Sequence, residues 1–183
     1  MSIERLSRVI GLGNIFAALM GSFVLAGDLE MSKINANWVF FSDQVMGGKS
    51  QGKAMALNEG NDQFVRLQGD VTTVNNGGFI QIRTPVNGLG KELKGLSLKI
   101  RGNGERYYVF IRTSGTMLPW QYYKAEFPSQ REWAEVSIEF ESFDRSSAWL
   151  SKKIKPETVK SIGIVAFGRE HKALVDVAAL QFF

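Results

Sequence analysis

The sequence predicts an all-β domain, a jelly-roll β-sandwich with little helix. Short runs of alternating, β-branched or aromatic residues are separated by Gly, Asn, Asp and Pro, a pattern typical of strands joined by turns. These runs recur at the spacing of a sandwich or jelly roll. The main helix signal is a proline-started turn at residues 155–159, so a doubly wound α/β fold is disfavoured.

The N-terminal segment has the three parts of a secretory signal. Arg5 and Arg8 precede an apolar run at residues 15–26, which ends in small residues. About twelve apolar residues are too few for a helix to cross a bilayer core of about 30 Å. We therefore predict a signal peptide at 1–26, a linker at 27–37, a sandwich domain at 38–183, and export to the periplasm or the medium. An uncleaved membrane helix that begins further back is the alternative.

Composition excludes several classes of function. The chain has no cysteine, which excludes disulfides, thiolate metal sites and cysteine nucleophiles. Its formal net charge is +4, and this small excess is spread along the chain, so no nucleic-acid surface is predicted. The single histidine, His171, lies in the charged segment 168–172, where we expect a solvated turn residue rather than part of a catalytic triad. We therefore predict that the domain is not an enzyme.

Ten strands are predicted in chain order. They cover residues 38–41, 53–57, 64–69, 78–83, 95–101, 106–113, 120–127, 133–139, 161–167 and 173–183. Because successive side chains of a strand point to opposite faces, alternation assigns the core. At 95–101 it predicts a core face of Leu96, Leu98 and Ile100 and a water face of Ser97, Lys99 and Arg101.

Three strands combine aromatic with polar side chains on the face that points away from the core. This second face is predicted to carry Phe79, Gln81, Arg83, Tyr108, Phe110, Arg112, Trp120, Tyr122, Lys124 and Glu126. Aromatic rings among hydrogen-bonding groups suit a ligand that is partly apolar and partly polar, such as a sugar or a protein hot spot. The alternative is a face covered by loops or by the N-terminal segment, with Arg112 or Lys124 paired to Glu126 in solvent.

Two glycine-rich turns stand out. The first is Asp43-Gln44-Val45-Met46-Gly47-Gly48-Lys49-Ser50, and the second is Asn75-Asn76-Gly77-Gly78-Phe79. Glycine allows positive φ and close backbone approach, so each turn is tight, and the Asp43 carboxylate is placed to bind its amides. Neither segment is a phosphate loop, because no helix follows it.

Together these two segments resemble the complex I intermediate-associated protein family, in which Asp-x-Val-Met-Gly-Gly-x-Ser is followed by Asn-Asn-Gly-Gly-Phe. The resemblance covers essentially all of the chain after the predicted signal peptide. It implies a galactose-binding-like jelly roll and a chaperone-like role in assembly, without an established reaction. It also implies that a structural calcium ion is one option, and Asp28 or Glu30 with Asp176 are the candidate oxygen ligands. Solvated carboxylates are the alternative, and no other cofactor is predicted.

Two hypotheses about function remain open at this point. The first is a protein-binding or assembly module, in which the two turns present Asp43, Gln44, Asn75 and Asn76 as a polar rim. The second is an exported carbohydrate-binding module, in which Phe79, Trp120 and Tyr122 stack on sugar rings while Arg83 and Arg112 bind hydroxyl groups.

Overall fold

The computed structural model describes residues 37–60 and 62–183. The predicted signal peptide, nearly all of the predicted linker and the calcium candidates Asp28 and Glu30 lie outside these residues, so cleavage and export stay predictions. Within the described part of the chain, no helix is long and apolar enough to cross a membrane.

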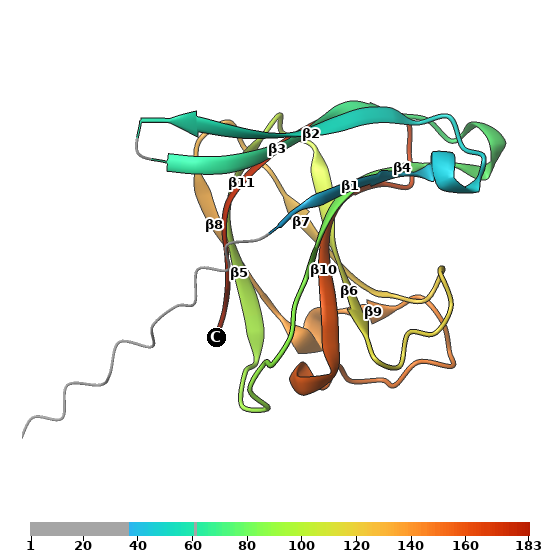
Figure 1. Ribbon diagram of the computed structural model, residues 1–183, viewed down its shortest axis with the longest axis vertical. Helices are drawn as coiled ribbons and strands as arrows, with labels where there is room; N and C mark the ends of the chain where they lie inside the picture. The colour runs from blue at the N-terminus through green and yellow to red at the C-terminus, as the bar shows by residue number, and fades with distance from the viewer. Residues whose placement is uncertain (1–36, 61) are drawn as a thin grey trace, which may run out of the picture.

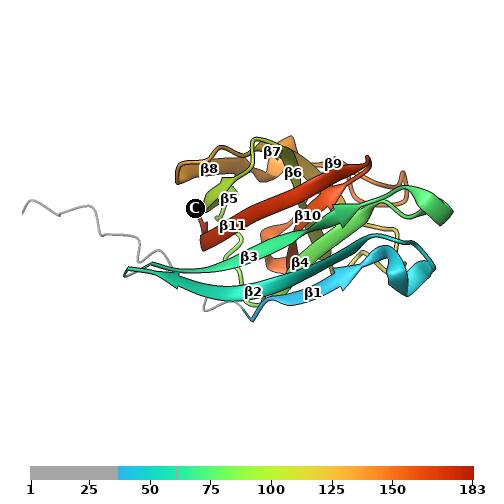
Figure 2. The same ribbon diagram turned by 90° about the horizontal axis from the view of Figure 1, so that it is seen from above.

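Two antiparallel sheets form a sandwich, as predicted (Figure 1, Figure 2). The first sheet has the order β1 (Val39–Ser42), β4 (Phe79–Pro85), β10 (Val159–Phe167), β6 (Arg106–Thr113), β7 (Tyr123–Pro128) and β9 (Asp144–Arg145). The second has the order β2 (Gln51–Glu59), β3 (Asp62–Val71), β11 (His171–Phe182), β5 (Gly95–Gly102) and β8 (Ala134–Glu139). Neighbours in each sheet are mostly distant in sequence, as expected of a jelly roll.

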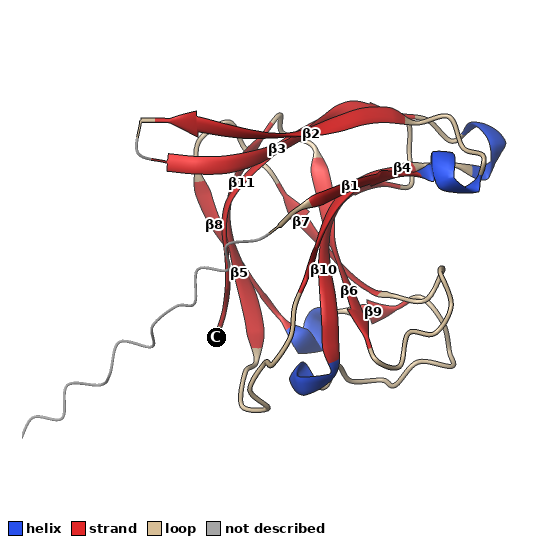
Figure 3. Cartoon of the chain, in the orientation of Figure 1, coloured by secondary structure: helices blue, strands red, loops and turns tan. Residues whose placement is uncertain are grey.

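Four single-turn 3₁₀ helices occur among the described residues: η1 (Asp43–Met46), η2 (Val74–Asn76), η3 (Phe140–Ser142) and η4 (Pro156–Thr158). Helix η4 begins at the proline that predicted a turn there. Figure 3 shows η1 and η2 together at one end of the molecule, where the amide of Asn75 donates to the carbonyl of Gly47 at 3.3 Å. The two glycine-rich turns are therefore neighbours in space.

The core lies between the sheets and follows the predicted alternation. In β4, β5 and β6 every second side chain is fully buried: Ile80, Ile82, Leu96, Leu98, Ile100, Tyr107, Val109 and Ile111. Truncating one such side chain, as in Leu98→Ala, typically costs about 2–5 kcal/mol. The Tyr107 hydroxyl remains satisfied in this core, since it donates to Asn103 at 2.7 Å and accepts the Leu174 amide at 2.8 Å.

Three sequence-based expectations were wrong in detail. Strand β7 begins at Tyr123 rather than Trp120, because the Gln121 side chain accepts the amides of Met117 and Leu118 and holds the preceding residues in a turn. Ser97 was expected in water but is buried, because β5 has a strand on each side and Ser97 lies between Ser137 and Gln181.

His171 is the third correction. It was expected as a solvated turn residue, yet it opens β11 and is half-buried. Its ring meets Tyr107 edge-on at 6.4 Å between centroids, and its Nδ1 lies 2.9 Å from the carbonyl oxygen of Arg169. The histidine is therefore packed against the core instead of standing in solvent.

Candidate functional site

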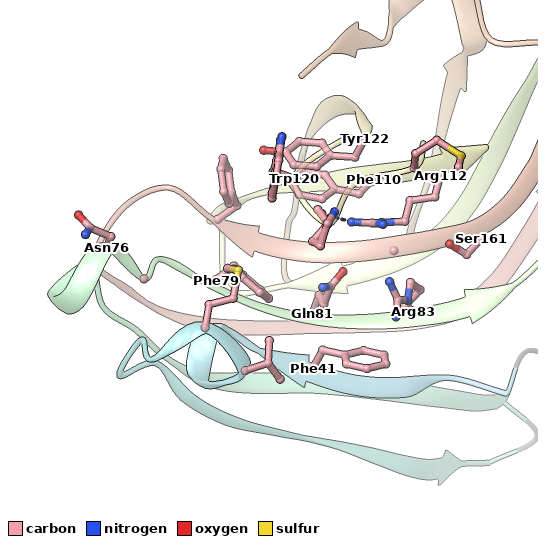
Figure 4. Close-up of a pocket in the computed structure, with 17 residues that line it drawn as sticks. Phe41, Asn76, Phe79, Gln81, Arg83, Phe110, Arg112, Trp120, Tyr122 and Ser161 are labelled. Atoms are coloured by element: carbon pink, nitrogen blue, oxygen red, sulfur yellow. Dashed lines mark hydrogen bonds between the residues drawn. The ribbon is translucent and has the colours of Figure 1, made fainter. Parts of the chain in front are cut away.

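A groove of about 650 Å³ opens on the outer face of the first sheet (Figure 4). It lies on the face that alternation singled out, over β1, β4, β10 and β6, and the turn containing η1 and the β6–β7 loop border it. Its lining includes six aromatic residues: Phe41, Phe79, Phe110, Trp120, Tyr122 and Phe167. Among residues 37–60 and 62–183, the second face of this sheet is thus an open groove and not a layer covered by loops.

The floor of the groove is recessed at Gly163. The strand register places Gly163 between Arg83 on β4 and Phe110 on β6, so the middle of this row has no side chain. A Cβ atom built at this glycine would lie 3.1 Å from Oε1 of Gln81, inside the groove. The missing side chain therefore gives the groove its depth.

An aromatic wall stands on one side of the floor. The rings of Phe110 and Tyr122 stack with centroids 4.0 Å apart and planes at 10°, and Phe167 meets Phe110 edge-on at 5.3 Å. Burial raises the pKa of the Tyr122 hydroxyl, and the nearby charge of Arg112 opposes that shift only in part. The wall is a rigid, largely apolar surface with a neutral phenol at its edge.

Two arginines bring positive charge into the groove. Arg83 lies over the ring of Phe41, with Cζ 4.3 Å from the centroid, and Arg112 donates to the carbonyl of Pro119. Burial lowers the pKa of Arg112, and the like charge of Arg83 lowers it further. None of the described residues that line the groove is acidic. The site is therefore cationic and suits an electron-rich or anionic ligand.

The rims of the groove are apolar and exposed. Val45 and Met46 of η1 are 73% and 63% exposed, and Met117 and Trp120 of the β6–β7 loop are 80% and 64% exposed. The loop has a defined shape, because Gln121 binds two of its amides and the hydroxyl of Ser146 donates to the carbonyl of Trp120 at 2.9 Å. Large apolar side chains held in solvent at a groove mark a binding surface.

Asp43 does not belong to the predicted polar rim, because it is fully buried. Its carboxylate accepts the amide and the hydroxyl of Ser50, the amide of Gly78 at 2.6 Å and the amide of Phe79 at 3.2 Å. Burial alone would raise its pKa, but these hydrogen bonds outweigh burial and lower it. The sequence-based expectation that Asp43 binds turn amides is confirmed, whereas its exposure at the rim was wrong.

The other three predicted rim residues are exposed, as expected. Gln44 donates to the carbonyl of Ser50 at 2.9 Å, and Asn75 links the two turns through Gly47. Asn76 alone of these three lines the groove. Asn75 and Asn76 both have positive φ, at 59° and 57°, a conformation that asparagine tolerates better than most residues.

Most of the predicted sheet-face residues meet in the groove. Phe79, Gln81, Arg83, Arg112, Trp120 and Tyr122 line it. Tyr108 does not line it, because its hydroxyl donates to Glu126 at 2.7 Å at the far end of the face. Hydrogen bonding to Glu126 and burial raise the pKa of Tyr108.

Sequence reasoning missed several lining residues: Phe41, Val45, Met46, Met117, Pro119, Ser161, Gly163 and Phe167. The run from Ile162 to Ala166 is apolar on both faces, so alternation could not show which of its side chains face outward. Phe41 carried a usable signal, because it follows Phe40 in a short strand and must point to the opposite face.

The calcium candidate Asp176 is fully buried on the outer face of the second sheet. Its carboxylate oxygens accept hydrogen bonds from Arg66 at 2.7 and 2.8 Å and from Arg101 at 2.8 Å. Burial would raise its pKa, but the two guanidinium groups outweigh burial and lower it. Among the described residues no group of three or more His, Asp or Glu side chains could hold a metal ion. Since Glu30 lies outside the described residues, a calcium ion at this carboxylate stays a prediction.

Comparison with known proteins places these features in a family. A family model described as complex I intermediate-associated protein 30 (CIA30) matches residues 28–174. The chain belongs to the CIA30 family. The resemblance inferred from the two glycine-rich turns is therefore confirmed, and in this CIA30 domain Asp43 joins those turns. A search of curated proteins found no match.

Solved structures similar to this CIA30 domain include carbohydrate-binding modules from Clostridium thermocellum. The family 11 module of the cellulosomal cellulase Lic26A-Cel5E is 13% identical with a TM-score of 0.67, and covers 84% of this chain and 93% of its own. The family 11 module in complex with a β-1,3-1,4-mixed-linked tetrasaccharide is 14% identical with a TM-score of 0.64, covering 87% and 91%. A family 30 module is 12% identical with a TM-score of 0.57, covering 81% and 91%. These likenesses confirm the predicted galactose-binding-like jelly roll.

Proposed function

We propose that this CIA30 domain is a protein-binding module, with a role in assembly, that holds an extended segment of a partner in the groove. The observation that carries the proposal is the makeup of the groove, which combines aromatic rings, two methionines and two arginines and has neither lysine nor an acidic residue in its described lining. Interface cores are enriched in aromatics, Met and Arg and depleted in Lys, Glu and Asp.

The side chains of the rims support a polypeptide occupant. Met46 on one side and Met117 on the other are the most adaptable apolar side chains available, and both are exposed. Methionine accommodates varied apolar side chains of a peptide, whereas a sugar-binding surface relies mainly on flat aromatic rings and hydrogen bonds. The membership of the chain in a family described by its association with complex I intermediates agrees with a protein partner.

Site-specific photo-crosslinking in cells tests the proposal. A photoreactive phenylalanine replaces Met117 at the rim, or Ser137 on the opposite sheet as the matched control. We expect one discrete crosslinked polypeptide from position 117 and none from position 137. The crosslink from position 117 should disappear when Gly163→Val fills the floor of the groove. Crosslinks that are the same at both positions, or that persist in the Gly163→Val background, would contradict a groove-bound partner.

A carbohydrate ligand is the second candidate. It is supported by the likeness to a module solved with a mixed-linked tetrasaccharide and by the highly exposed Trp120 at the groove. A glycan array probed with the full-length chain, followed by calorimetry on each hit, tests it. Removal of a stacking ring costs about 1 kcal/mol or more, so Trp120→Ala should weaken true binding about fivefold or more. An array without hits, or a hit that Trp120→Ala leaves unchanged, would rule it out.

A further inference from the structure

Arg83 and Arg112 lie in the groove without a carboxylate partner among the described residues. Figure 4 shows both guanidinium groups among the residues that line the groove. Within the part of the chain that the structure describes, their one hydrogen bond is from Arg112 to the carbonyl of Pro119. On the opposite sheet, by contrast, Arg66 and Arg101 share the carboxylate of Asp176. Half-buried Arg169 likewise pairs with Glu105, and half-buried Arg145 donates to the carbonyls of Ala148 and Leu150. The groove pair has no carboxylate partner among the described residues and makes only one hydrogen bond with them.

The charge of Arg83 also disfavours the charged form of Arg112. Burial and the charge of Arg83 both lower the pKa of Arg112, although the guanidinium stays charged. The apolar wall of Phe110 and Tyr122 keeps part of the surrounding water away. A bound anion would relieve both effects, since a charge-assisted hydrogen bond strengthens where solvent is excluded.

Other charges on this sheet face reinforce the preference. Lys124 lies 6.0 Å above the ring of Phe167, at the far side of the aromatic wall, and adds positive charge. The carboxylate of Glu126 on the same face is held by Arg106 at 3.1 Å and by the hydroxyl of Tyr108 at 2.7 Å. That carboxylate is thus already paired.

We infer that Arg83 and Arg112 bind a carboxylate side chain of the partner, so that the groove selects a segment in which Asp or Glu is flanked by apolar residues. Guanidinium groups bind carboxylates through parallel hydrogen bonds, and the amide of Gln81, next to Arg83 along β4, supplies a further donor. The apolar neighbours of that acid would pack on Met46, Met117 and Trp120. This inference rests on the proposed protein-binding function and names the chemistry of its ligand.

Peptide selection on the intact protein tests the inference. A random linear peptide library displayed on phage is panned against the full-length chain. The most enriched peptides are then synthesised with their acidic residues, or with Asn and Gln in their place, and measured by fluorescence anisotropy. We expect enrichment of Asp or Glu between apolar residues, and a loss of affinity of about tenfold or more on conversion to the amides, because hydrogen bonds to charged groups are the strong ones.

Variants separate charge recognition from a structural role of Arg112. In the double variant Arg83→Gln, Arg112→Gln the acidic and amide peptides should bind about equally, whereas Arg83→Lys, Arg112→Lys should keep part of the preference for acid. Arg131→Gln, at an exposed position outside the groove, is the matched control and should keep all of it. If the double glutamine change only loosened the β6–β7 loop, the acidic and amide peptides would both bind more weakly. The ratio of their affinities would then stay at its wild-type value.

Each remaining outcome of the peptide selection would overturn the inference, the proposed function or both. Enrichment of neutral or basic peptides that compete for the groove would overturn the inference and leave the proposed function standing. Another outcome is that no peptide is enriched, while polygalacturonate binds the wild type and does not bind the double glutamine variant. That result would assign the arginine pair to an acidic glycan and would overturn both the inference and the proposed function. A library that yields no peptide sensitive to Gly163→Val would overturn the proposed function, and the inference with it.

Discussion

The Asp43 carboxylate accepts the backbone amide of Gly78 at 2.6 Å, across 35 residues of sequence. Through this bond and those from Ser50, one buried side chain fastens both glycine-rich turns that identify the family. The turns in turn place Val45, Met46 and Asn76 along the groove. Asp43 therefore shapes the groove although it does not line it.

Replacement of Asp43 by Asn should destabilise the domain by about 2–4 kcal/mol. The amide keeps the size of the carboxylate but removes a charge that four donors bind, and it directs its own N–H group toward donors. Urea unfolding followed by tryptophan fluorescence measures the loss. Asp144→Asn, at an exposed position of β9, should change the free energy of unfolding by less than about 0.5 kcal/mol. Equal effects of the two changes would contradict this account of Asp43.

Gly77→Ala should be destabilising by about 1–3 kcal/mol, because the added Cβ would lie 2.4 Å from Oδ2 of Asp43. Gly115→Ala is the control, since its Cβ would meet only the Thr113 hydroxyl at an ordinary 3.6 Å. Thermal unfolding of both variants compares them. If Gly77→Ala unfolds at the wild-type temperature, the carboxylate does not fill the space next to this glycine.

Acid should weaken the domain through Asp43 and Asp176. The pKa of each is lowered in the folded protein, since hydrogen bonds and, for Asp176, two arginines outweigh the effect of burial. The unfolded chain therefore takes up protons first as the pH falls. Their contribution to stability is complete above about pH 5 and is lost as the pH falls below 3.8 through the folded values.

The measurement is the urea midpoint of unfolding at intervals between pH 7 and pH 2, for the wild type and for Asp176→Asn. Asp176→Asn should cost about 3–5 kcal/mol at pH 7, because it leaves half-buried Arg66 without its carboxylate and Arg101 with Glu59 alone. The variant should also show a shallower fall in midpoint below pH 5. Parallel curves for the two proteins would show that Asp176 does not titrate with unfolding.

Gln121→Leu should loosen the loop that forms one rim of the groove. The Gln121 side chain accepts the amides of Met117 and Leu118 at 2.9 and 3.0 Å, and leucine offers no acceptor. Hydrogen exchange should show both amides losing protection by about tenfold, corresponding to about 1–1.5 kcal/mol, while β10 is unchanged. Gln130→Leu, exposed beyond the end of β7, is the control. Unchanged protection at both amides would mean that the turn itself fixes the rim.

The strands and their faces could be predicted from sequence because apolar and polar residues alternate wherever one face of a strand is polar. The alternation of β4 and β6 placed Arg83, Phe110 and Arg112 on one surface without any knowledge of the pairing. In β10 both faces are buried over much of the strand, so the pattern was silent about Gly163 and Phe167.

Side-chain hydrogen bonds to backbone amides explain two other differences. An acid before a glycine-rich turn normally faces solvent, and only the pairing of the two turns shows why Asp43 is enclosed. The same holds for Trp120, where a side chain one residue later, Gln121, fixes a turn in a stretch whose composition predicts strand.

The division between Asp43 and the rim has a consequence for how members of this family can diverge. The Asp43 carboxylate points inward and binds its donors in both turns, whereas Val45, Met46 and Asn76 are exposed on the same turns and line the groove. Substitution of the exposed set changes what the groove accepts and leaves the buried carboxylate and its donors intact. A shared motif in this family is thus evidence of a common frame, and two proteins that carry it can have unrelated partners.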